Sequence, residues 1–131
     1  MNHTYSTPLA GNGVRFVGNL PDGSEIALIV DIGSHHADTP NYQAAADKQL
    51  SVAGRELINR SSGAISGISC EFITEYTENL PQYDITSKYQ KMAYFDYNGR
   101  LWDIAVYSER GDSEQVNALF NHVIETFKLL S

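Results

Sequence analysis

The chain lacks several features that would define its class at once. Only one cysteine, Cys70, occurs among 131 residues, so no internal disulfide can form. No apolar run approaches the length needed to cross a bilayer, and the first 13 residues lack the basic start and hydrophobic centre of a secretory signal. We therefore expect a cytoplasmic protein without membrane insertion, or an extracytoplasmic one if a leader has been removed.

Basic residues are also scarce. Nine lysines and arginines stand against 16 aspartates and glutamates, and the formal net charge is -7. A field of this sign repels nucleic acid, so we expect no nucleic-acid partner. The length fits one domain with its own core, and we assign residues 1–131 to a single domain. The polar segment 1–13 predicts a poorly ordered lead-in.

The strongest local signal is a hairpin within residues 89–107. Asn98 and Gly99 tolerate the positive φ values of a type I′ turn, and aromatic and β-branched residues flank them. Because a two-residue loop fixes the register, Phe95 should face Trp102 on the core side of the sheet. The other side carries a half-apolar set that water or a partner could cover: Met92, Tyr94, Asp96, Leu101, Asp103, Ala105 and Tyr107.

Two further elements are predicted in the first half of the chain. Apolar segments at 14–17 and 25–32 predict an antiparallel hairpin. Apolar residues at three- and four-residue spacing predict a helix that begins at Pro40, with Thr39 as its N-cap, and ends within 60–63.

The second half adds a strand and a helix around the hairpin. Alternation over 68–76 predicts a half-exposed antiparallel strand, and the turn-forming residues of 78–87 predict a surface connection. A continuous apolar stripe predicts a C-terminal helix, formed by Val116, Leu119, Phe120, Val123, Ile124 and Phe127. The fold class is therefore α+β, an antiparallel β-sheet with helices packed on it.

Three segments carry a resemblance to a known family. They are Gly67-Ile68-Ser69-Cys70-Glu71-Phe72, Asn98-Gly99-Arg100-Leu101-Trp102 and Val123-Ile124-Glu125-Thr126-Phe127-Lys128. In these segments the chain resembles the PsbP/Mog1-like α/β/α sandwich domains, including the bacterial DcrB-like proteins. The resemblance implies binding rather than catalysis, because such domains dock on a GTPase, dock on the lumenal side of photosystem II, or hold secreted effectors.

Candidate chemical groups are few. His35, His36 and Asp38 are weak candidates for a metal site, but their spacing is poor and they are more typical of a solvated loop. Cys70 fits a small core residue better than a nucleophile. Asp96 and Asp103 share one face of the hairpin and could serve acid–base chemistry, although such pairs more often face solvent.

The function we expect is that of a non-enzymatic protein-binding or adaptor domain that needs no cofactor. Its predicted partner-binding residues are Tyr94, Leu101, Asp103 and Tyr107. One alternative is a small hydrolase or isomerase with a pocket between sheet and helix. Another is an acidic chaperone or adaptor for a secreted protein. A homodimer is compatible with each of the three.

Overall fold

The structure is a computed structural model that describes residues 2–9, 13–21, 23, 25–51, 55–77, 88–108 and 113–128, with backbone only for 2–9 and 55. Its centre is a seven-stranded antiparallel sheet in the order β1-β2-β3-β7-β6-β5-β4. The strands are β1 (Asn2–Leu9), β2 (Gly13–Asn19), β3 (Glu25–Gly33), β4 (Arg55–Ile65), β5 (Ile68–Thr77), β6 (Lys88–Tyr97) and β7 (Arg100–Ser108). The described helices are α1 (Tyr42–Leu50) and α2 (Ser113–Thr126).

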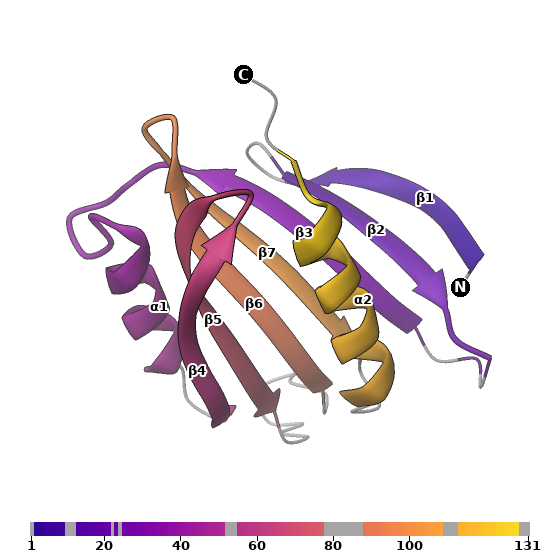
Figure 1. Cartoon of the computed structure of the whole chain (residues 1–131). Coiled ribbons are helices and arrows are strands. Elements are labelled where there is room, and N and C mark those ends of the chain that lie inside the picture. The colour runs from indigo at the N-terminus through magenta and orange to yellow at the C-terminus, as the bar shows by residue number, and fades with distance from the viewer. Residues whose placement is uncertain are drawn as a thin grey trace.

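The two helices cover opposite faces of the sheet. Ala93 and Phe95 of β6 belong to the clusters that pack against α2, whereas their neighbours Met92 and Tyr94 belong to the cluster beneath α1. Since successive residues of a strand point to opposite faces, the sheet is the middle layer of three. Figure 1 shows α2 across the middle of the sheet and α1 towards the end that carries β4 and β5. The predicted α+β class is confirmed.

The central hairpin has the predicted turn and register. Asn98 and Gly99 adopt φ values of 55° and 74°, and Phe95 pairs with Trp102. Their rings stack with centroids 5.6 Å apart. The predicted stripe of α2 packs on this same face, where Val116 and Phe120 are buried. Each large side chain removed from water contributes roughly 1.5–3 kcal/mol, so this layer forms a major part of the core.

Helix α1 begins and ends at different residues from those predicted. Its N-cap is Asn41, whose side chain accepts a hydrogen bond from the Ala44 amide at 2.8 Å. Thr39 instead forms an isolated backbone bridge with His36. The helix ends at Leu50, because residues 55–65 pair with β5 as strand β4. Pairing with a neighbouring strand has here overridden a local pattern that favours a helix.

Strand β5 is buried on both faces, not half-exposed. Glu71 and Glu75 point towards α1 and have exposed fractions of 9% and 1%. Glu71 accepts hydrogen bonds from Arg60 and Ser62, and Glu75 accepts them from two glutamine side chains, Gln49 of α1 and Gln90 of β6. These partners satisfy the carboxylates, which is why a strand with a polar face can lie inside the protein.

The N-terminal segment also differs from its prediction. Asn2–Leu9 forms the edge strand β1, paired antiparallel with β2. An edge strand needs a partner on one side only and accepts proline, so a polar segment that contains proline can still form one. The predicted surface connection at 78–87 lies outside the described residues. In the part of the chain that is described, no helix is long and apolar enough to span a membrane.

Candidate functional site

The predicted partner-binding residues lie on the α1 face of the hairpin, as expected, but in different environments. Tyr94 is 7% exposed beneath α1, and its hydroxyl donates to Gln49 Oε1 at 3.2 Å. Leu101 packs against the same cluster. Tyr107 is half-buried beyond α1 and accepts a hydrogen bond from Arg15 at 2.7 Å. A partner could therefore reach Tyr107 more readily than Tyr94, and binding through this set stays a prediction.

Asp103 has a neighbour that the sequence did not reveal. It pairs across the sheet with Asp31 of β3, which places two carboxyl groups opposite each other on the α1 face. Burial, and then repulsion from Asp31, raises the pKa of Asp103 from 3.8 to about 7. Asp96, the carboxylate first grouped with Asp103, instead accepts hydrogen bonds from the Tyr42 amide at 3.2 Å and contacts His35 at 2.8 Å.

The weak metal candidates do not form a three-ligand cluster. His35 Nε2 lies 2.8 Å from Asp96, whereas Asp38 pairs with Lys48 at 2.6 Å. Its hydrogen bond with Lys48 lowers the pKa of Asp38. Across the described ranges, no three His, Cys, Asp or Glu side chains gather in a way that could hold a metal ion. Cys70 is 1% exposed in the core, and burial raises the pKa of its thiol to about 11.

The outer edge of β4 is a surface that the sequence analysis did not identify. β4 is the last strand of the sheet, and a register shift between Leu57 and Asn59 leaves Ile58 at an irregular position. Leu57 and Ile58 are 46% and 52% exposed, respectively. The regular segment 59–65 is mostly exposed, and its side chains are mainly small: Asn59, Arg60, Ser61, Ser62, Gly63, Ala64 and Ile65.

Beyond the irregularity at Ile58, segment 59–65 has little of the protection that edge strands usually carry. Lysine, proline or inward-pointing charge normally prevents another strand from pairing with such an edge. Within 59–65 the only charged residue is Arg60, and its guanidinium is bound by Asp47 and Glu71 on the α1 face. The small side chains leave the backbone accessible, and we identify this segment as a candidate binding edge.

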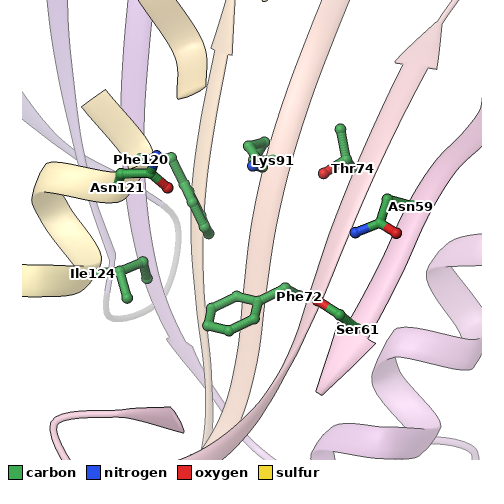
Figure 2. Close-up of a pocket in the computed structure, with 8 residues that line it drawn as sticks. All are labelled: Asn59, Ser61, Phe72, Thr74, Lys91, Phe120, Asn121 and Ile124. Carbon is green, nitrogen blue, oxygen red and sulfur yellow. The ribbon is translucent and has the colours of Figure 1, made fainter. Parts of the chain in front are cut away.

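A pocket of about 200 Å³ opens beside the edge, on the α2 face. Figure 2 shows its polar and aromatic walls, which are contributed by β4, β5, β6 and α2. Lys91, Thr74, Asn59 and Ser61 come from the strands, Phe120, Asn121 and Ile124 come from α2, and the Phe72 ring of β5 lies between the two groups. The lining residues are Asn59, Ser61, Phe72, Thr74, Lys91, Phe120, Asn121 and Ile124.

The position of the Phe72 ring in this pocket depends on a glycine. A Cβ atom built on Gly63 would lie 2.5 Å from Phe72 Cε2. The ring therefore occupies space that any other residue at position 63 would fill. Phe72 also meets Phe120 edge to face, with ring centroids 6.0 Å apart. These contacts fix the aromatic wall between the sheet and α2.

The sequence does contain a signal for Lys91. Lys91 is in phase with Phe95, which was assigned to the core side, and a lysine in that phase is unusual. The β4 residues of the pocket could not be found in the same way, because their segment was predicted as the end of a helix. The turn that could have corrected this is Ser66-Gly67, with φ values of 52° and 81°.

Comparisons with known proteins identify a shared fold. No protein-family model matches the chain, and no curated protein matches it. A crystal structure of PA94, a protein of unknown function from Pseudomonas aeruginosa suggested to be a regulator, is similar with a TM-score of 0.74. The match covers 94% of this chain and 86% of that chain at 10% sequence identity. At this identity the similarity supports the architecture and carries no function across.

Proposed function

We propose that this chain is a non-enzymatic protein-binding domain that holds an extended segment of its partner against the outer edge of β4. The observation that carries the proposal is the exposed, regular segment 59–65, which has small side chains and one already neutralised charge. An extended peptide can add to such an edge through backbone hydrogen bonds, and side-chain contacts then give specificity.

Exposed apolar side chains next to this segment favour the same function. Leu57 and Ile58 would lie at one end of an added strand and could contact its apolar side chains. The net charge of -7 favours a partner segment with basic residues. The resemblance to PsbP/Mog1-like and DcrB-like domains is compatible with such a role and stays a proposal, as does an adaptor role for a secreted protein.

The pocket gives less support to the hydrolase or isomerase alternative. A hydrolytic site usually brings a nucleophile or water together with a base that activates it. Among the eight residues that line this pocket, Lys91 is the only one with a strongly basic or acidic side chain. A cavity that contained Asp103, Tyr94 or a histidine would favour this alternative, and none of these residues lines the pocket. Binding is the simpler use of this arrangement.

The test is affinity capture from the native host followed by mapping of the complex. Ile58→Lys places a charge at the edge, and Val14→Lys is a matched control because Val14 is an exposed apolar residue of β2, far from β4 in the sheet order. We expect wild type and Val14→Lys to retain one specific protein that Ile58→Lys loses. In the complex, the amides of 59–65 should gain protection from hydrogen exchange.

Two results would contradict the proposal. One is a partner that Ile58→Lys retains as well as wild type does. The other is protection that appears around Asp103 and Tyr107 but not along β4, which would move the interface to the α1 face of the hairpin. Sedimentation of the purified protein tests whether the partner is a second copy of this chain. If the wild type is a dimer and Ile58→Lys is a monomer, the edge mediates self-association and not binding to a different protein.

A further inference from the structure

We propose that the pocket between α2 and strands β4–β6 binds a small organic carboxylate that carries one compact, flat apolar group. The site is separate from the protein-binding edge proposed above, although Asn59 and Ser61 of β4 lie beside both. The proposal rests on three observations: the row of polar side chains on the pocket floor, the charge of Lys91 that has no carboxylate partner in the described ranges, and the size and shape of the pocket beside the aromatic wall.

The floor of the pocket contains a row of three polar side chains from adjacent strands. Thr74 of β5 pairs with Lys91 of β6 on one side and with Asn59 of β4 on the other. Neighbouring strands lie about 4.8 Å apart, so an ammonium, a hydroxyl and an amide are presented at neighbouring positions on one face. Each of the three can donate a hydrogen bond, and a carboxylate only accepts them.

Lys91 has a charge that the described protein does not neutralise. Its Nζ lies 5.5 Å from the centroid of the Phe120 ring, and no carboxylate in the described ranges forms an ion pair with it. Lys48 and Arg60, by contrast, each bind a carboxylate. Burial lowers the pKa of Lys91, which means that its ammonium has lost part of its hydration. An anion in the pocket would replace that lost stabilisation.

The aromatic wall beside Lys91 selects the rest of the ligand. Phe72 and Phe120 meet edge to face, and Ile124 of α2 lies beside them, so a flat apolar group finds aromatic and aliphatic walls. The volume of about 200 Å³ is somewhat larger than that of a cavity of about 150 Å³ that accepts benzene. One ring with one carboxylate therefore fits. A phosphate dianion fits less well, because one lysine supplies a single positive charge and no arginine lines the pocket.

Benzoate is the probe for the test, with benzamide as its uncharged analogue and acetate as the anion without a ring. We expect benzoate to bind the purified protein with a dissociation constant on the order of 1 mM, given its small size. In NMR spectra it should shift the amides of β5, β6 and α2 that surround the pocket. Benzamide and acetate should each bind at least tenfold more weakly, because each lacks one of the two matched groups.

Two kinds of variant separate the contributions of charge and space. Lys91→Met keeps an unbranched side chain without the charge and should weaken benzoate binding at least tenfold, whereas Lys48→Met on α1 should not change it. Asn121→Trp should fill the mouth of the pocket and abolish binding. Its control is His122→Trp on the same helix, since His122 is exposed and does not line the pocket.

Several outcomes would overturn this inference. They are benzoate shifts that fall outside the pocket, equal affinity for benzamide, or unchanged binding by folded Lys91→Met or Asn121→Trp. If Lys91→Met does not fold, the pair Asn121→Trp and His122→Trp still decides the question. Ile58→Lys should bind benzoate as wild type does, so failure of the pocket and failure of the β4 edge can be told apart.

Discussion

Asp31 and Asp103 occupy opposing positions on β3 and β7, so two carboxyl groups share one cross-strand site at the centre of the sheet. Like charges directly opposite each other destabilise an antiparallel pair. The structure accommodates them because Asp103 retains its proton to about pH 7, as its raised pKa indicates. The Asp103 carboxyl is therefore neutral at mildly acidic pH and becomes negatively charged as the pH rises through about 7.

The first prediction concerns stability as a function of pH. The pKa of Asp103 is about 7 in the folded protein and close to 3.8 in the unfolded chain, so the folded state holds the extra proton between these values. Its contribution to the free energy of unfolding is complete below about pH 4 and is lost as the pH rises through 7, a change on the order of 2–4 kcal/mol. Asp103→Asn should remove this decrease, as measured by urea unfolding across the pH range.

Two further variants test the cause of that decrease. Asp31→Asn removes the repulsion but not the burial, so part of the slope should remain. Asp38→Asn alters an exposed carboxylate that pairs with Lys48 of α1, and it should leave the slope of the Asp103 transition unchanged. A wild-type protein whose stability rises steadily from pH 4 to pH 7 would contradict the assignment.

The second prediction concerns the unequal cover of the α1 face. Ile73 of β5 is fully buried beneath α1, whereas Ile29 of β3 points to the same face, is only partly buried, and lies beyond the helix. Ile73→Ala should reduce the free energy of unfolding by about 2–5 kcal/mol, and Ile29→Ala by roughly 1 kcal/mol. Equal losses in chemical unfolding would mean that something covers Ile29 in solution.

The third prediction separates the two carboxylates that bind Arg60. Its guanidinium lies 2.7 Å from Asp47, whose side chain is 68% exposed, and 3.0 Å from Glu71, whose side chain is 11% exposed. Arg60→Ala leaves a buried carboxylate with fewer partners and should cost roughly 2–3 kcal/mol. Asp47→Ala removes an exposed pair and should cost less than about 1 kcal/mol. Similar costs for both would show that Glu71 is not buried as described.

The fourth prediction concerns the single thiol. Cys70 is buried and its pKa is raised to about 11, so neither access nor ionisation favours alkylation. We expect iodoacetamide at about pH 8 to leave the folded protein unmodified and to label it fully in concentrated guanidinium chloride, as read by mass spectrometry. Rapid labelling of the native protein would place Cys70 at the surface.

The sequence predicted correctly those elements whose structure is determined by their own residues, such as a turn or an amphipathic helix. Asn98 and Gly99 supply the backbone freedom of their turn, and the stripe around Phe120 indicates a helix with one buried face. Residues 55–65 form a strand because β5 lies beside them, and the spacing of Leu50 and Leu57 gave a misleading helical signal. Tertiary pairing decided the structure there, and local preference did not.

The same distinction applies to the candidate sites. The face shared by Tyr94 and Tyr107 could be read from alternation, but its division by α1 could not. The pocket unites Lys91 with side chains from β4, β5 and α2, and the Asp31–Asp103 pair joins two strands far apart in the chain. Spacing within one segment cannot reveal such groups, because they exist only once the sheet order is known.

That sheet order also determines how the chain can fold. β1–β3 form one run of sequential antiparallel neighbours and β4–β7 form another, and the two runs meet only where β3 pairs with β7. At this junction Ile26 of β3 pairs with Ser108 of β7. The long stretch of chain between these two residues must therefore close into a loop before the β3–β7 pairing can form. Each run can form early from local contacts, whereas formation of the central ladder should limit the folding rate.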